Sequence, residues 1–352
     1  MNQPEKTGGS RKKRLGTVLF VLFNVAVIAV TAYFDFGSSE TISKKDLLDI
    51  NPLYILAVLG CFVAALAAET GKYYSLLRHT TGISSLRTAF ETAVLGKYYD
   101  NITPFGAGGQ PFQGVYLHRS GADASSATAI PVAGFLSLQG AFIIMAVSVL
   151  VFGGRIVESA GLMIPAYVGL AFYLFIPLAI VFFAVAPSVT ERIIRFFIQL
   201  FAKLHLIKKP EEKEASFIAT LHGSIVSMKS IFQSKFLFIR ILLFSLLFQV
   251  AITSMPYFVL RAFGNTLGFW HVFRYCTYIY LCITFIPTPG NAGAAEGSFY
   301  ALFSILGQGH LFWAMLVWRF FCYYLFILTG LAVSIFGHGL KGNALPGRGN
   351  AA

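Results

Sequence analysis

Long apolar runs alternate with short polar segments along most of the chain. Each run approaches the roughly 20 residues that a helix needs to cross the hydrocarbon core of a bilayer. The pattern predicts membrane-spanning helices over residues 15–34, 53–70, 124–152, 162–186, 236–260, 268–287 and 311–337. We therefore expect an all-α, polytopic membrane protein with about seven or eight spans.

Two segments between these spans break the helical pattern with a Thr-Pro step, a group of glycines and a polar side chain. The first is DNITPFGAGGQ at residues 100–110, and the second is PTPGNAGAAE at residues 287–296. Non-helical backbone at membrane depth survives only where it is buried in protein or lines a wet cavity. Because paired breaks in two halves of a chain are typical of transporter binding sites, the two segments predict a substrate site.

Each break has enough residues for a helix, a turn and a second short helix. We interpret the breaks as re-entrant hairpins over residues 87–120 and 288–308, with a fully crossing broken helix as the alternative for either. The chain then divides into a basic N-terminus, two related membrane halves that indicate an internal repeat, a central polar segment between them, and a flexible tail. The N-terminus covers residues 1–14, the two membrane halves cover 15–186 and 236–338, the central segment covers 187–235, and the tail covers 339–352.

The central segment predicts two amphipathic helices and not a soluble domain. Over residues 188–206 and again over 217–232, apolar residues recur at helical spacing opposite a polar face, which is typical of helices in the headgroup region. Basic residues in this segment and at 11–14 place both in the cytoplasm, while the acidic segment 35–51 belongs outside. The basic C-terminal tail also favours the cytoplasm, but the span count places it outside, and these two indications conflict.

Composition and charge agree with a membrane protein. The chain is 56% hydrophobic and only 12% charged, against about a quarter charged in soluble domains. Its net charge of +12 comes from basic residues that flank the spans, so we expect an anionic lipid surface as partner and no nucleic acid. The cysteines and histidines show no disulfide or metal spacing, and no cofactor is expected. The lack of a Walker loop or a GxSxG elbow in the sequence argues against an ATP-driven pump or a serine hydrolase.

The two breaks supply most of the candidate substrate-binding residues. Freed backbone N–H groups at the start of a half-helix, together with the helix dipole, can cradle an anion such as a lipid phosphate. The candidates are Asn101, Thr103, Pro104, Gly106, Gly108, Gly109, Gln110 and Gln113 in the first break, Thr288, Pro289, Gly290, Gly293 and Glu296 in the second, and Arg119 and Arg319 nearby. The alternative is that the breaks are packing kinks whose backbone groups are satisfied by neighbouring helices.

Glu296 is the principal single candidate, because a carboxylate in an apolar neighbourhood marks a substrate pathway or a counter-ion by default. Its expected partner is Arg319, Arg274 or a cationic group of the substrate, and a purely structural brace between Glu296 and Arg319 is the competing interpretation. Arg119 likewise either holds a phosphate with two hydrogen bonds or anchors the chain at the membrane surface. Weaker candidates are Glu69, Glu91 and Asp100.

The two breaks differ in charge. The first has no formal charge between Asn101 and Gln113, whereas the second contains Glu296. This asymmetry favours a zwitterionic or mixed-charge lipid head over a simple anion.

The residues of the two breaks also carry a resemblance to a known family. The stretches DNITPFGAGGQPFQGVYLHRSG and FIPTPGNAGAAEGSFYALF resemble the lysylphosphatidylglycerol synthase transmembrane-region family, which includes the flippase domain of the bacterial multiple peptide resistance factor. The resemblance covers nearly the whole chain, and PTPG…G…E is its more specific motif. Many members carry an acidic residue and an arginine where this chain has Gln110 and Gln113, which implies a changed headgroup preference.

The resemblance implies a lipid flippase and not an enzyme. Such a protein moves aminoacylated phosphatidylglycerol, typically the lysyl form, from the inner to the outer leaflet of the bacterial cytoplasmic membrane and confers resistance to cationic peptides. The aminoacyl-transfer domain of full-length members is not expected here, so a separate aminoacyl-phosphatidylglycerol synthase would be a partner, as would further copies in a homo-oligomer. The alternatives are an integral-membrane headgroup transferase with Glu296 as general base, a transporter of a glycolipid or isoprenoid lipid, and a non-transporting subunit of another complex.

Overall fold

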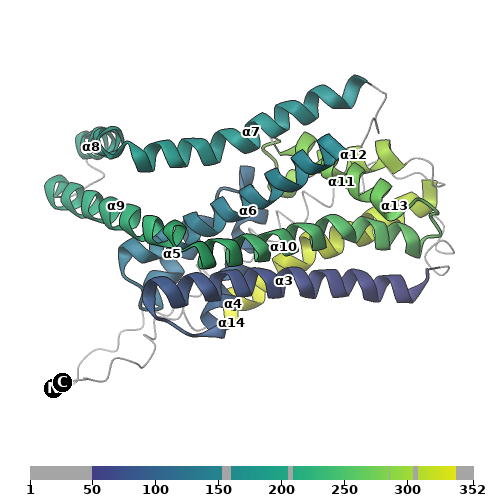
Figure 1. Ribbon diagram of the computed structural model, residues 1–352, viewed down its shortest axis with the longest axis horizontal. Helices are drawn as coiled ribbons and strands as arrows, with labels where there is room; N and C mark the ends of the chain where they lie inside the picture. The colour runs from purple at the N-terminus through teal and green to yellow at the C-terminus, as the bar shows by residue number, and fades with distance from the viewer. Residues whose placement is uncertain (1–49, 153–159, 205–208, 285, 304–307, 338–352) are drawn as a thin grey trace, which may run out of the picture.

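The computed structural model describes residues 50–152, 160–204, 209–284, 286–303 and 308–337 (Figure 1). The predicted first span at 15–34, the basic N-terminus 1–14 and the tail 339–352 lie outside the described residues. The described residues form helices and no strands, which confirms the all-α prediction. The α-helices are α3 Pro52–Thr81, α4 Leu86–Ile102, α5 Gly109–Arg119, α6 Ala124–Phe152, α7 Ala160–Val185, α8 Pro187–Lys203, α9 Pro210–Gln233, α10 Lys235–Ala262, α11 Phe269–Ile283, α12 Ala294–Phe303, α13 Gln308–Arg319 and α14 Leu325–Phe336.

Three short turns of helix join some of these elements. The 3₁₀ turns η1 (Pro104–Gly106) and η2 (Pro289–Asn291) fall in the two breaks, and a π turn η3 (Phe320–Tyr324) links α13 to α14. Within the described residues, five helical segments are long and apolar enough to cross a membrane: Pro52–Thr81, Ala124–Phe152, Ile164–Val185, Lys235–Ala262 and His310–Phe336. The chain is therefore a multi-pass membrane protein, and five of the predicted spans are confirmed.

The predicted span at 268–287 is shorter than expected. It forms α11, a helix of 15 residues that ends at Ile283. At 1.5 Å per residue this helix is about 22 Å long, less than the roughly 30 Å of a hydrocarbon core. Pro287 and Pro289 follow closely, and a proline disfavours helical conformation in the residue before it. The second break therefore begins inside the predicted span, and α11 leads directly into it.

Helices α3 and α10 form the centre of the molecule and lie side by side along its long axis (Figure 1). Small residues such as Ala65 and Ala68 of α3 are fully buried in one apolar cluster with Met255 and Val259 of α10. Close packing of small side chains is what holds helices together in lipid, where the hydrophobic effect between helices is absent. Helix α4 packs against α3, α5 and α14, and so places the first break beside this centre.

Helices α7, α8 and α9 lie outside this centre (Figure 1). The two amphipathic stretches of the central segment form α8 and α9, and α9 packs on α6, where the Ser224 hydroxyl donates to the Ser125 carbonyl at 3.1 Å. Helix α7 runs along one side and contacts mainly α11. Gly169 makes that contact possible, because a Cβ there would collide with the carbonyl of Leu281.

Candidate functional site

Both breaks begin with an extended threonine followed by a proline. Thr103 has φ −112° and ψ 146°, and Thr288 has φ −95° and ψ 147°. Each threonine carbonyl accepts a hydrogen bond from the amide three residues further on, at 3.2 Å in the first break and 3.0 Å in the second. The Thr-Pro step that repeats in the sequence therefore makes the same backbone turn twice.

Two consecutive left-handed residues follow each proline. In the first break they are Phe105 and Gly106, with φ of 58° and 61°, and in the second they are Gly290 and Asn291, with φ of 59° and 54°. Glycine and asparagine adopt this conformation readily, whereas for other residues it costs about 1–2 kcal/mol. Phe105 is thus the strained member of the set, and its side chain is exposed and lines a cavity.

An acidic side chain caps the half-helix that follows each turn, but the acids come from opposite directions. In the first break Asp100, from the preceding helix α4, accepts the amide of Gly109 at 2.9 Å, and the Thr103 hydroxyl accepts the amide of Gly108 at 2.9 Å. In the second break Glu296, from the following helix α12, accepts the amide of Gly293 at 2.5 Å, the backward bond of a capping box. These three amides are therefore occupied within the protein, and an anion could reach them only by displacing a side chain.

The tips of the two breaks, η1 and η2, contact each other beside a cavity of about 870 Å³. Residues of α3, α4, α5, α6, α7, α10 and α11, and of both turns, line the cavity. It brings together six of the predicted site residues: Asn101, Gly106, Gln110, Gln113, Thr288 and Gly290. The structure thus gathers residues of both breaks around a single polar space inside a mostly apolar body.

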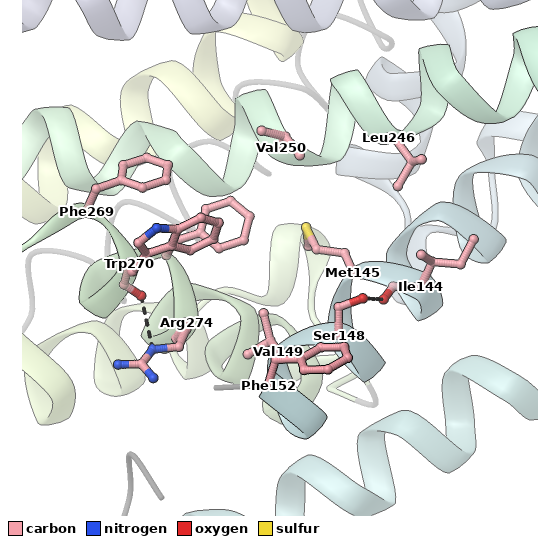
Figure 2. A pocket seen from close by; sticks show the side chains of 11 residues that line it. Ile144, Met145, Ser148, Val149, Phe152, Leu246, Val250, Phe269, Trp270 and Arg274 are labelled. Atoms are coloured by element: carbon pink, nitrogen blue, oxygen red, sulfur yellow. Dashed lines mark hydrogen bonds between the residues drawn. The ribbon is translucent and has the colours of Figure 1, made fainter. Parts of the chain in front are cut away.

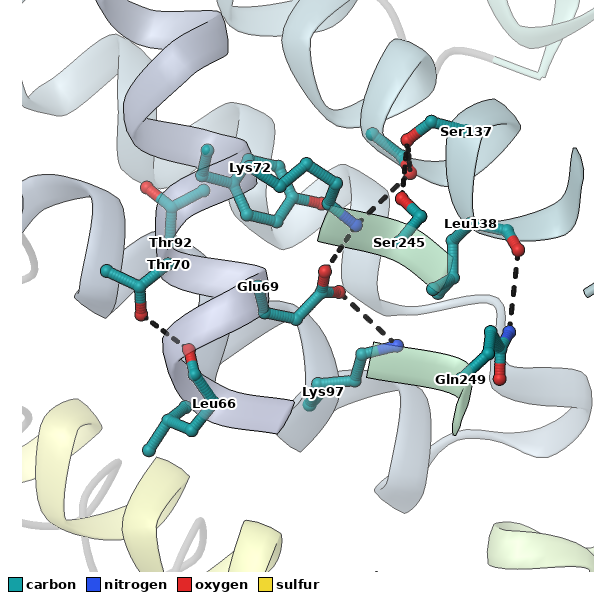
Figure 3. Close-up of polar contacts among 12 residues, drawn as sticks. Leu66, Glu69, Thr70, Lys72, Thr92, Lys97, Ser137, Leu138, Ser245 and Gln249 are labelled. Carbon is teal, nitrogen blue, oxygen red and sulfur yellow. Dashed lines mark hydrogen bonds and ion pairs between the residues drawn. The ribbon is translucent and has the colours of Figure 1, made fainter. Parts of the chain in front are cut away.

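Four charged side chains of α3 and α4 line this cavity. Glu69 forms ion pairs with two lysines, with Lys72 on its own helix and with Lys97 at 3.5 Å (Figure 3). The Lys72 ammonium also donates to the Gly134 carbonyl at 3.3 Å and is fully buried. The Lys97 side chain is 17% exposed, so it is the more accessible of the two lysines. With Asp100 as the second acid, the four formal charges sum to zero and both signs face the same space.

Gln113 lines the cavity but holds the first hairpin together. Its amide nitrogen donates to the Thr92 carbonyl at 2.9 Å, and its amide oxygen accepts from the Tyr73 hydroxyl at 3.2 Å. Gln113 is 3% exposed, and both ends of its amide are bonded across the α3–α4–α5 interface. The Gln113 amide is therefore fixed in place. Within the described residues, the Gln110 side chain forms no hydrogen bond to the protein.

Glu296 and Arg319 are buried against each other and do not line the cavity. Arg319 forms an ion pair with Glu296 and donates to the Gly290 carbonyl at 3.0 Å. Both side chains are at most 5% exposed. This is the arrangement of a brace between the second break and the last span, the interpretation that the sequence left open. Contact between Glu296 and a substrate stays a prediction.

The brace extends from Arg319 to the first break. The Arg319 guanidinium lies 4.7 Å from the ring centre of Tyr323, and the Tyr323 hydroxyl donates to the Asn101 carbonyl at 3.2 Å. Tyr323 belongs to the π turn η3, and such turns are frequent at functional sites. Two side chains of the last span, Arg319 and Tyr323, therefore connect the two breaks.

The other predicted residues shape the turns or lie elsewhere. Outside the cavity lining are Thr103, Pro104, Gly108, Gly109, Pro289 and Gly293. Arg119 lies at the end of α5, along a mostly apolar groove of about 480 Å³ that shares Gln110, Pro111 and Val132 with the cavity. Arg119 therefore does not line the cavity.

Sequence reasoning missed the two lysines of the cavity. The signal was present, because Glu69 and Lys72, and again Lys97 and Asp100, stand three residues apart on one helix face within apolar surroundings. Ionisable residues in a membrane span mark functional sites by default. The neutral Gln139 and Gln249, which also line the cavity, carry no comparable signal in the sequence.

A family model described as the lysylphosphatidylglycerol synthase TM region matches residues 15–330. The match includes both breaks, the charged residues of α3 and α4, and the Glu296–Arg319 pair. No curated protein matches the chain.

Proposed function

We propose that this chain, which belongs to the lysylphosphatidylglycerol synthase TM region family, is a phospholipid translocase. Its substrate would be aminoacylated phosphatidylglycerol, mainly the lysyl form, moved from the inner to the outer leaflet of a bacterial cytoplasmic membrane. The observation that supports this most is the polar cavity of about 870 Å³ where the two breaks meet. Ligand cavities are commonly about 300–1,000 Å³, so a lipid head fits this space.

The charges of the cavity suit a head that carries both signs. In lysyl-phosphatidylglycerol a phosphate carries a negative charge and two amino groups carry positive charges. Lys97, the more exposed lysine, would pair with the phosphate, and Asp100 with an ammonium group. Charged groups at membrane depth are costly unless paired. The head would therefore exchange some of its bonds with water for bonds with these side chains.

One wall of the cavity is apolar and would leave the acyl chains in lipid. Phe172, Ile176 and Ile180 of α7 and Val132 and Phe135 of α6 all line the cavity. Helix α7 is largely exposed and packs mainly on α11, with a smaller contact to α6. We assign the lateral opening to the gap between α6 and α7, where the head would slide along the cavity while its chains remain outside.

A leaflet assay with purified protein in liposomes tests the proposal. Lysyl-phosphatidylglycerol is placed in the inner leaflet, and an impermeant amine reagent measures its arrival outside. We expect the protein to accelerate this arrival and to leave the lipid chemically unchanged. An arrival rate equal to that of protein-free liposomes would contradict the proposal, and a modified lipid head would instead indicate the headgroup transferase.

A further inference from the structure

A further apolar groove, of about 680 Å³, lies apart from the polar cavity (Figure 2). It is formed by α6, α10 and α11, and the two spaces share no lining residue. Its lining is Ile144, Met145, Ser148, Val149, Phe152, Leu246, Val250, Phe269, Trp270, Phe273 and Arg274. This groove has no part in the translocation pathway proposed above.

The floor of the groove is buried and its rim is exposed. Met145, Val149 and Phe273 are at most 8% exposed and belong to one buried cluster, whereas Phe152 and Trp270 at the rim are 86% and 67% exposed. The Ser148 hydroxyl donates to the Ile144 carbonyl of its own helix at 2.7 Å, so it presents little polarity to the groove. The groove is thus a preformed apolar trough open to the surrounding lipid.

Charge and aromatic side chains gather at one end of the trough. Figure 2 shows Trp270 and Arg274 together at one end and Leu246 at the other. The Arg274 ε-nitrogen donates to the Trp270 carbonyl at 3.2 Å, which fixes the guanidinium at this end. Tryptophan is enriched at headgroup level in membranes, and arginine binds phosphate with two parallel hydrogen bonds.

We propose that this groove binds one anionic phospholipid, with an acyl chain in the trough and the phosphate at Arg274. The positive charge at a single end of an otherwise apolar lining selects a molecule that is negative at one end and apolar along its length. Phosphatidylglycerol has this chemistry, whereas a fatty chain without a charged head does not use Arg274. We expect this lipid to stay bound and not to be translocated, because the lining residues of the trough and of the charged cavity form no polar path between the two spaces.

Photo-crosslinking of the full chain in vesicles tests this proposal. A photoreactive amino acid replaces Ile144, which lines the trough and is 47% exposed. In phosphatidylglycerol vesicles we expect a covalent adduct with the mass of one phospholipid. The R274Q variant should lower the yield of this adduct about tenfold, as loss of a charge-assisted hydrogen-bond pair implies. In vesicles of a digalactosyl diacylglycerol, whose head carries neither phosphate nor charge, R274Q should leave the yield unchanged.

Arg240 provides the matched control. It lies on α10, 5.5 Å from the ring of Phe236, and does not line the trough. The R240Q variant should keep the adduct yield of the parent protein. Equal yields in R274Q and R240Q, or a crosslink to residues 15–34 or to a second copy of the chain, would overturn the proposal. The experiment does not measure translocation, so its result and that of the leaflet assay are independent.

Discussion

The two Thr-Pro breaks have the same backbone turn and opposite surroundings. In the first, the capping acid Asp100 lines the polar cavity beside Lys97. In the second, the capping acid Glu296 is turned away from the cavity and paired with Arg319. The comparison separates two positions of an acid at a broken span: one presents its charge to the cavity, and the other holds the break to its neighbour.

The largest effect on stability should come from removing the Glu296–Arg319 ion pair that braces the second break. R319M leaves the Glu296 carboxylate buried without its cation, which should lower the free energy of unfolding by about 3–5 kcal/mol. The double variant E296Q/R319M removes both charges, and the glutamine oxygen can still accept the Gly293 amide, so most of the stability should return. Heat- or denaturant-induced unfolding in detergent measures the stability of both variants. If R319M is stable but no longer translocates lipid, the result would instead support a contact between Glu296 and the substrate.

Replacement of a turn glycine should also cost more stability in the second break than in the first. G290A places a Cβ against the Tyr323 ring and forces alanine into a left-handed conformation, which together should cost about 2–4 kcal/mol. G106A has the same backbone strain, but its nearest neighbour would be Asp100 at 3.8 Å, so the cost should stay at about 1–2 kcal/mol. Equal losses in the two variants, measured by the same unfolding assay, would show that the second turn is not more tightly packed than the first.

Removal of the accessible cation of the cavity should impair function more than stability. K97Q leaves Glu69 paired with the buried Lys72, so the protein should keep its fold. Loss of a phosphate contact of about 1.4 kcal/mol corresponds to a tenfold lower translocation rate, and we expect a reduction of at least about that size for every phospholipid tested. A K97Q protein with the parental rate would remove Lys97 from the proposed site.

The smallest effect should come from an acid that only caps a helix. Asp123 precedes α6, and its carboxylate accepts the Ser126 amide at 3.0 Å; hydrogen bonds with Ser126 lower the pKa of Asp123 below its ordinary value of 3.8. D123A should cost about 1 kcal/mol at neutral pH. Because the folded pKa is depressed, this contribution is complete above the unfolded pKa and is lost as the pH falls through the folded pKa. If D123A is still less stable than the parent protein at the lowest pH measured, the ionised carboxylate is not the source of the stabilisation.

Much of the fold could be predicted from the sequence, because hydrophobic runs and Pro/Gly steps report local preferences. Helix α6 has the predicted bounds of 124–152, and both breaks fall where Thr-Pro and glycine place them. The site was harder to predict, since it depends on which helices meet. The pairing of Glu69 with Lys97 exists only because α3 packs on α4, and nothing local indicates that Glu296 turns toward Arg319 and away from the cavity.

The most direct test of the central claim compares two lipids in one variant. D100N removes a charge from the cavity, while its side-chain oxygen can still accept the Gly109 amide. If a mixed-charge head binds between the two breaks, D100N should slow the translocation of lysyl-phosphatidylglycerol about tenfold relative to phosphatidylglycerol, which has no ammonium group to lose a partner. An unchanged ratio of the two rates in the leaflet assay would contradict the claim.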